Sequence, residues 1–224
     1  MRLELQDIAI GIGDIELQGR LTVPHPAAGM VVFAHGSGSS RHSPRNRRVA
    51  ALFHERNLAT LLLDLLTVEE ERSIEVEAAL RFDVDVLGER LIRATDAAIA
   101  AGHTRGLPLG YFGGSTGAAA ALIAAARRPA QIAAVVSRGG RPDLASGSLS
   151  AVRTPTLFVV GGLDAWVLKA NRAAAARMSA PYRIEVIAGA SHLFEEPGAL
   201  DKVGRLSAGW FVDQLSLGRM SEAC

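Results

Sequence analysis

Six short apolar runs, separated by stretches with helical signals, constrain the fold of this sequence more than any other feature. Such runs are typical of parallel strands that are buried on both faces of a sheet. When strands alternate with helices, right-handed crossovers place the helices on both faces. The pattern therefore predicts an α/β fold with a mostly parallel sheet. The runs are residues 30–34, 59–63, 107–112, 132–136, 156–160 and 183–187.

Two further segments, at the start of the chain, have a different pattern. Apolar and polar residues alternate over residues 2–10 and again over residues 15–23, and the glycines of the segment 11–14 between them suit a turn. This pattern predicts an antiparallel β-hairpin. With the six buried runs it makes a predicted sheet of eight strands.

Helix signals lie between the predicted strands. Ser43 and Pro44 are an N-cap followed by a first-turn proline, and Asp83 can cap a second helix. An alanine-rich helix is predicted over residues 115–128 and a closing helix over about residues 197–217. We expect about five or six helices in all, on both faces of the sheet.

The predicted elements use nearly all of the 224 residues, so we expect a single domain, residues 1–224, without an inserted lid domain. Only the connections 66–82 and 137–155 are long enough to overhang a site. The three consecutive glutamates at 69–71 are interpreted as a solvated loop or the start of a helix.

The charge balance gives no reason to expect a charged macromolecular partner. Lys and Arg total 24 against 23 Asp and Glu, which leaves a formal charge of +1. No overall field therefore favours nucleic acid, an anionic membrane or a polyanion. The six histidines show no metal-ligand spacing, so neither a metal nor another cofactor is expected. The oligomeric state is not predicted.

The cysteine content and the N-terminus suggest a location. The only cysteine is Cys224, so no disulfide can form within the chain. Residues 1–7 are charged and alternating, unlike a signal peptide, and no later segment approaches the roughly 18 apolar residues of a membrane span. We expect a soluble, cytoplasmic protein.

A G-x-S-x-G motif, Gly113 to Gly117, follows a predicted strand and opens a predicted helix. This is the context in which such a motif presents a nucleophilic serine, and the small residues at its ends avoid collisions at the sharp turn. The helix N-terminus also favours developing negative charge. We interpret Ser115 as the nucleophile and the Thr116 N–H as an oxyanion donor. The alternative is a tight turn with Ser115 as an N-cap.

The loop 35–40, with the sequence HGSGSS, follows the strand 30–34, where hydrolases with this motif draw a second oxyanion donor. The Ser37 N–H is the candidate. A nucleotide-binding loop is disfavoured because the loop lacks the third glycine of G-x-G-x-x-G and a Walker A lysine. We interpret His35 as a structural residue that shapes the loop. The role of His42 is left open: it follows the loop and is a candidate to line the site and bind substrate.

An acid and a base follow later predicted strands. Asp164 comes directly after the strand 156–160, at the sheet edge where α/β sites are built, and His192 follows the last strand. Ser, acid and His occur in the chain order that this mechanism uses. Asp143 competes with Asp164, but is interpreted as an N-cap or turn residue. A buried Asp164 would hold the imidazole in the useful tautomer.

Five segments carry a resemblance that spans nearly the whole chain: HGSGSSR at 35–41, GGSTG at 113–117, SRGGRPD at 137–143, GGLD at 161–164 and SHLFEEP at 191–197. They resemble the α/β-hydrolase superfamily, and within it small lidless enzymes similar to dienelactone hydrolases. The resemblance implies an α/β-hydrolase fold and Ser115, Asp164 and His192 as a catalytic triad. Dienelactone hydrolases proper use a cysteine where this chain has Ser115.

The predicted activity is hydrolysis of small carboxylic esters through an acyl-enzyme intermediate. Arg138 and Arg141 could meet a carboxylate of the substrate, or they could be structural partners of Asp143 or Glu195. Acyl transfer or cofactor-free perhydrolysis would use the same triad. A non-catalytic binding module of the same fold is a further alternative, although it would not need all three triad residues.

Overall fold

The computed structural model describes residues 2–222, with side chains up to residue 216, so Cys224 lies outside the described residues. Eight strands form one sheet in the order β1-β2-β4-β3-β5-β6-β7-β8. β1 (Arg2–Ile12) and β2 (Ile15–His25) pair antiparallel, and β2 pairs antiparallel with β4 (Leu58–Leu63). All other pairs are parallel. The predicted α/β-hydrolase fold is confirmed.

Each buried apolar run of the sequence forms a parallel strand, with ends within a few residues of the prediction. Burial on both faces of the sheet explains why five of these runs lack polar alternation. The run 183–187 is the exception to the predicted burial, because it forms β8 at the edge of the sheet, where most of its residues are exposed or half-buried. The remaining parallel strands are β3 (Gly29–Ala34), β5 (Leu109–Gly114), β6 (Ile132–Arg138), β7 (Thr156–Gly161) and β8 (Tyr182–Ile187).

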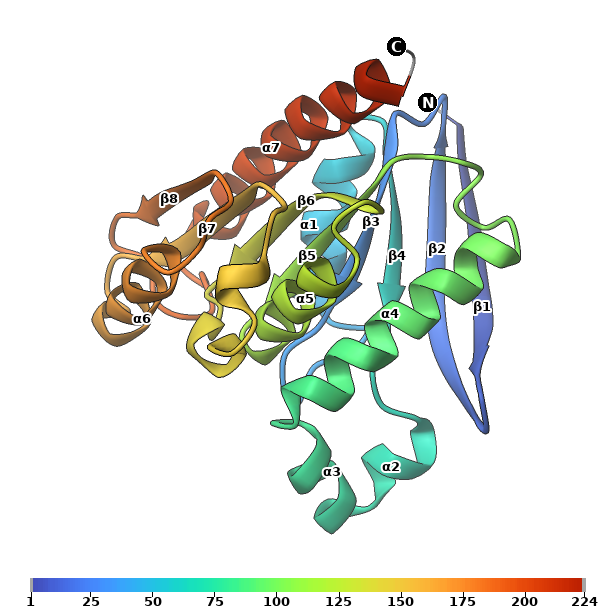
Figure 1. The fold of residues 1–224 in the computed structure, drawn as a ribbon, viewed down its shortest axis with the longest axis horizontal. Helices are drawn as coiled ribbons and strands as arrows, with labels where there is room; N and C mark the ends of the chain where they lie inside the picture. Colours follow the sequence, from blue (N-terminus) through green and yellow to red (C-terminus); the bar gives the residue numbers. More distant parts are fainter. Residues whose placement is uncertain (1, 223–224) are drawn as a thin grey trace.

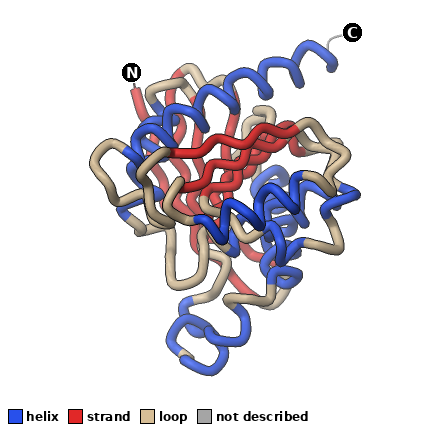
Figure 2. The backbone as a smooth tube through the Cα atoms, turned by 90° about the vertical axis from the view of Figure 1, so that its left-hand side faces the viewer, coloured by secondary structure: helices blue, strands red, loops and turns tan. Residues whose placement is uncertain are grey.

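Helices cover both faces of the sheet (Figures 1 and 2). Helices α1 (Pro44–His54) and α7 (Ala199–Glu222) pack together on one face. Helices α4 (Val84–Ala100) and α5 (Thr116–Arg127) pack together on the other face, and α6 (Ala165–Ala175) packs against β7. The predicted caps are present, because Ser43 Oγ accepts the Asn46 N–H and Asp83 Oδ1 accepts the Val86 N–H.

The two connections that are long enough to overhang a site both form short helices. The connection 66–82 forms two short helices, α2 (Val68–Arg72) and α3 (Ile74–Leu80), which project below the sheet in Figure 1. The connection after β6 forms two short 3₁₀ helices, Pro142–Ala145 and Leu149–Ala151.

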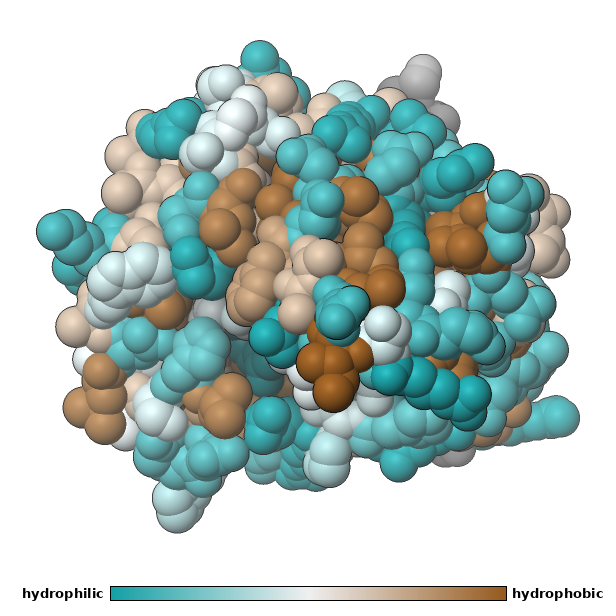
Figure 3. Space-filling model, turned by 90° about the horizontal axis from the view of Figure 1, so that it is seen from below, coloured by the Kyte–Doolittle hydropathy of each residue, from teal (hydrophilic) through white to brown (hydrophobic). Residues whose placement is uncertain are grey.

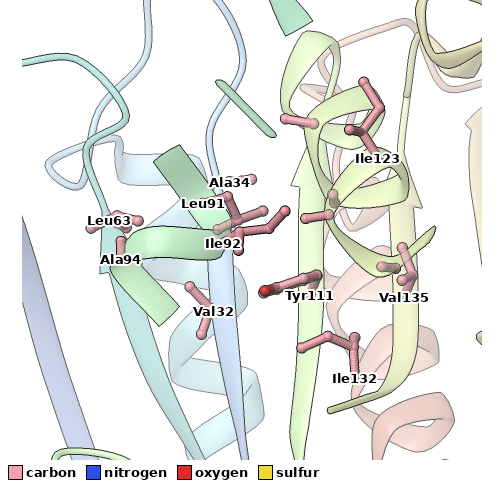
Figure 4. Packing of buried hydrophobic residues seen from close by; sticks show 14 of the residues in the cluster. Val32, Ala34, Leu63, Leu91, Ile92, Ala94, Tyr111, Ile123, Ile132 and Val135 are labelled. Atoms are coloured by element: carbon pink, nitrogen blue, oxygen red, sulfur yellow. The ribbon is translucent and has the colours of Figure 1, made fainter. Parts of the chain in front are cut away.

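The core lies in two layers, one on each side of the sheet. Figure 4 shows part of the layer under α4 and α5, where Tyr111 lies among aliphatic side chains. Its buried hydroxyl donates to Thr95 Oγ1 at 3.1 Å, which satisfies the polar group. The opposite layer contains an aromatic cluster with ring centroids 4.8 to 5.6 Å apart, formed by Phe33, Phe53, Phe112 and Phe211. In residues 2–222, no helix has the length and apolar character to cross a bilayer.

Candidate active site

Ser115 lies on a strained turn between β5 and α5. Its backbone has φ 51° and ψ −120°, a conformation that side-chain-bearing residues rarely adopt. Two backbone hydrogen bonds join the turn to the end of β6 and the loop after it: the Ser115 N–H donates to the Arg138 carbonyl at 3.2 Å, and the Arg141 N–H donates to the Ser115 carbonyl at 3.0 Å. The nucleophile candidate is therefore fixed to the loop that follows β6.

The glycines of the motif are required by close packing. A Cβ on Gly117 would collide with the backbone carbonyl oxygens of Ala34 and His35, and one on Gly113 would lie 2.6 Å from the Gly117 carbonyl oxygen. The elbow and the end of β3 therefore approach each other closely only because these positions lack side chains. The same approach brings the loop 35–40 next to Ser115.

Asp164 and His192 form a hydrogen-bonded pair at the ends of β7 and β8. His192 Nδ1 and Asp164 Oδ2 are 2.7 Å apart. Because a carboxylate only accepts hydrogen bonds, Nδ1 carries the proton and a neutral ring has Nε2 free to accept one. The Asp164 side chain is 16% exposed and that of His192 is 40% exposed. The acid is sheltered while the base is open to a substrate.

Asp164 also begins helix α6. Its Oδ1 accepts the Val167 N–H at 3.4 Å, while Oδ2 holds His192. The two oxygens thus have separate partners, and the start of α6 fixes the orientation of the carboxylate. Helix α6 was not among the helices predicted from the sequence, although an Asp before Ala165-Trp166-Val167 is an N-cap signal.

The loop 138–141 lies between the two halves of the candidate triad. It holds both hydrogen bonds to the Ser115 backbone, and a Cβ on Gly139 would be 3.5 Å from His192 Cε1. Gly139 has φ 50°, which suits glycine. Ser115 and His192 therefore flank the same short loop, although they are far apart in the sequence.

The two predicted oxyanion donors differ in their surroundings. The Thr116 N–H is the first of helix α5, where backbone N–H groups have no partner within the helix. The Ser37 N–H donates to Thr116 Oγ1 at 3.0 Å, so it already has an acceptor in this structure. The Ser37 hydroxyl donates to the Arg81 carbonyl at 3.0 Å. Ser37 therefore links the oxyanion loop to both α5 and the end of α3.

His35 has the structural role that the sequence indicated. Nδ1 is 3.0 Å from the Gly36 carbonyl, and Nε2 accepts the Leu65 N–H at 3.0 Å. Burial lowers the pKa of the His35 imidazole, which favours the neutral ring that these two bonds require. Both nitrogens are occupied, so His35 shapes the loop.

Arg41 and Asp64 anchor the loop 35–40 through a pairing that was not predicted from the sequence. The Arg41 N–H donates to Asp64 Oδ1 at 2.5 Å, and the Arg41 guanidinium pairs with Asp64 Oδ2. Asp64 directly follows β4 and is buried. Its place at the carboxyl end of a buried strand was the available signal.

The two arginines after β6 have different environments. Arg141 pairs with Asp143 at 2.7 Å, and its guanidinium lies 4.6 Å from the Trp166 ring centroid. Arg141 is therefore a structural ion-pair partner. The Asp143 carboxylate is bonded to Arg141, whereas His192 is bonded to Asp164. Arg138 has no such partner: its Nε and Nη1 are buried, and no described residue accepts a hydrogen bond from them. His42 is exposed beside the oxyanion loop.

A cavity of about 290 Å³ lies between the oxyanion loop and the α2–α3 connection. The loop 35–40 forms one wall, and Leu66, Leu87 and three charged side chains form the other: Glu71, Glu77 and Arg81. Figure 3 views the molecule from this side, where apolar side chains (brown) are interspersed with polar ones (teal). Among the described residues, no group of three or more His, Cys, Asp or Glu could hold a metal ion.

Comparison with known proteins finds relatives that match almost the whole chain. The crystal structure of a dienelactone hydrolase from Anabaena variabilis is 48% identical, has a TM-score of 0.92, and overlaps 96% of this chain and 99% of that one. Proteins named as provisional phosphoribosyl transferases, from two strains of Mycobacterium tuberculosis, are 50% identical over 210 residues. That match covers 94% of this chain but 46% of theirs, so the chain spans about half of their length.

More distant structures share the fold. Est1E from Butyrivibrio proteoclasticus is 15% identical with a TM-score of 0.78, over 94% of this chain and 99% of that one. A dienelactone hydrolase-like promiscuous phosphotriesterase from metagenomic libraries is 18% identical with a TM-score of 0.69, over 97% and 98% of the two chains. No family model matches the sequence.

Proposed function

Because this chain belongs to the dienelactone hydrolase family of α/β-hydrolases, we propose that it is a serine hydrolase that cleaves small carboxylic esters through an acyl-enzyme intermediate. The observation that supports this most is the 2.7 Å bond between His192 and Asp164, on the loop edge that also carries Ser115 on its strained turn. Ser115 replaces the thiol of dienelactone hydrolases proper. A hydroxyl depends on a general base for activation more than a thiol does, so the His192–Asp164 pair would be needed to remove the Ser115 proton.

In the proposed first step, His192 Nε2 takes the Ser115 hydroxyl proton while Ser115 Oγ attacks the ester carbonyl. Asp164 stabilises the resulting imidazolium through Nδ1. The tetrahedral intermediate collapses, and the leaving alcohol takes the proton from Nε2. In the second step a water gives a proton to His192 and attacks the acyl group, which releases the carboxylic acid and restores the Ser115 hydroxyl.

The oxyanion of each intermediate would receive hydrogen bonds from the Thr116 and Ser37 N–H groups. The Ser37 N–H has to exchange its bond to Thr116 Oγ1 for one to the oxyanion, or share it. The bond is 3.0 Å long and neutral, so a charged oxyanion is the stronger acceptor. This arrangement satisfies the half-buried donor between turnovers.

Two observations support small substrates. The site has no inserted lid domain over the described sheet edge, and the cavity beside the oxyanion loop has a volume of about 290 Å³. Small acyl esters would fit such a space, and long lipid chains would extend beyond it. Hydrolysis of para-nitrophenyl esters should therefore not keep rising with chain length beyond octanoate.

Labelling with a fluorophosphonate tests the nucleophile. The wild-type protein should be labelled and should hydrolyse para-nitrophenyl acetate, because only an activated serine reacts with both. Ser115→Ala should lose the label and lower kcat by a factor of about 10⁴ or more. Ser150→Ala, at an exposed serine outside the site, is the matched control and should keep both activities. Labelling that survives in Ser115→Ala would disprove the assignment.

Other reactions can use the same residues. The acyl group on Ser115 would pass to an alcohol in an acyl transferase or to peroxide in a perhydrolase, so product analysis with competing acceptors distinguishes these from hydrolysis. The name of the Mycobacterium relatives belongs to chains about twice as long as this match. In this chain, the candidate triad of Ser115, Asp164 and His192 favours acyl chemistry.

A further inference from the structure

Arg138 presents a guanidinium without a counter-ion beside the nucleophile turn. Its Nε and Nη1 are shielded from solvent and have no acceptor among the described residues. The charged group that acts on it is Arg45, which has the same sign. The side chain as a whole is part-buried, so a small solute can reach it. Among the described residues, no carboxylate forms an ion pair with Arg138.

The charge is present at neutral pH. Burial, with a contribution from Arg45, lowers the pKa of Arg138 to about 10, which leaves the guanidinium protonated at pH 7. An unpaired buried charge destabilises a fold, because the ion loses its hydration and gains no partner. A bound anion would remove this penalty.

Packing does not explain why this position is an arginine. Arg138 Nη2 lies 2.7 Å from the point where a Gly114 Cβ would be, so the guanidinium fills the space beside this glycine. An uncharged side chain of similar length would fill the same space without the electrostatic cost. Arg141, three residues later, has a carboxylate partner and an aromatic ring beneath it. The contrast identifies Arg138 as the arginine with unused binding capacity.

We propose that Arg138, together with Arg45, binds a carboxylate or phosphate group next to Ser115. Arg138 Nη2 lies 2.7 Å from the Cβ position of Gly114, so an anion on this guanidinium would lie beside the residue that precedes Ser115. Arg45 is in the first turn of α1, and its side chain is 38% exposed. Its contact with Glu195, 3.3 Å long and on the surface, is weak enough for an incoming anion to compete.

The planar guanidinium suits an anion with two oxygens in one plane, which it can bind through two parallel hydrogen bonds. The anionic group is either part of the ester substrate or a separate small anion. Binding alone tests the site without reference to hydrolysis, whereas the choice between the two sources rests on the proposed esterase function.

Thermal unfolding in inorganic phosphate tests the site, with sodium chloride used to hold the ionic strength constant. Saturating phosphate should raise the Tm of the wild-type protein by about 5 °C. Arg138→Met should lose this increase, and without phosphate its Tm should equal or exceed that of the wild type, because an unpaired charge is removed. Arg128→Met, at a surface arginine paired with Asp96, is the control and should keep the phosphate effect.

Arg45→Gln provides a second variant at an exposed side chain, for which folding is not at risk. It should weaken phosphate binding about tenfold, the loss expected for one charge-assisted contact. An equal phosphate effect in the wild type and Arg138→Met, or no effect in the wild type, would overturn the proposal.

Two esters then identify the source of the anion. For monomethyl succinate relative to methyl butyrate, the ratio of kcat/KM should fall about 10-fold or more in Arg138→Met if the carboxylate belongs to the substrate. An unchanged ratio, with phosphate binding lost, assigns the site to a separate anion. Arg128→Met should keep the wild-type ratio. If no variant hydrolyses either ester, the esterase proposal fails while the phosphate result stands.

Discussion

Single residues at this site serve more than one purpose. Asp164 orients His192 with one oxygen and caps α6 with the other. Thr116 contributes a candidate oxyanion N–H, and its side chain accepts the Ser37 N–H. Both residues stand at the start of a helix, so each combines a structural role there with a role in the proposed reaction. Substitutions should therefore be chosen so that they remove one task and preserve the other.

Asp164→Asn separates its two tasks. An asparagine caps a helix about as well as an aspartate, so the Tm should change by no more than a few degrees. The amide cannot hold His192 in the required tautomer, and kcat for para-nitrophenyl acetate should fall by a factor of about 10⁴. Asp83→Asn, the same change at the N-cap of α4, should leave kcat unaltered. An active Asp164→Asn variant would assign the acid role to another residue.

Among the helices, the α2–α3 connection is the element with the least support. No residue of either helix is buried. Polar contacts hold it instead: a capping box between Thr67 and Glu70, and a bidentate pair from Arg90 to Glu70 at 2.6 and 2.7 Å. Ile74 at the tip is 85% exposed. Because this connection forms one wall of the cavity, its motion would change the volume of that cavity.

Hydrogen exchange should show this difference between elements. Amides of α2 and α3 should exchange faster than those of α5, which is almost entirely buried, because few apolar contacts oppose local opening. Glu70→Gln removes the charge that pairs with Arg90 and should speed exchange in α2 and α3 further, with no change in α5. Equal protection of all three helices in the wild type would contradict the inferred mobility.

For the whole molecule, stability should depend on pH through His54. This residue ends α1, and its Nε2 is 2.9 Å from Thr60 Oγ1 on β4. Burial lowers the pKa of His54 to about 4 in the folded protein, against about 6.5 in an unfolded chain. Above pH 6.5 both states are neutral. Between pH 6.5 and 4 the unfolded state binds the proton first, so the folded state loses stability.

Comparison of the wild type with His54→Gln between pH 7 and pH 4.5 measures this effect. The wild type should lose about 1–2 kcal/mol more than the variant, a figure that is reduced because the imidazole is partly open to solvent. Urea titrations at fixed pH give the free energies of unfolding. Parallel pH curves for the two proteins would remove His54 as the cause.

The sequence was sufficient for the fold class and for the order of the candidate triad. Buried strands require uninterrupted apolar runs, hairpins require alternation and turns require glycine, and each of these patterns is local in the chain. The nucleophile turn was recognisable for the same reason, since its glycines lie within two residues of Ser115. Asp164 and His192 followed from their places directly after strands.

Only the tertiary structure decided which side chains pair with which. The acceptor of the Ser37 N–H lies 79 residues away, and the sequence does not distinguish a paired Arg141 from an unpaired Arg138. The ion pairs between Arg41 and Asp64 and between Arg90 and Glu70 likewise form only because separate elements pack side by side. Backbone patterning is set by neighbours in the chain, whereas the partner of a polar side chain is set by whatever the fold brings within about 3 Å of it.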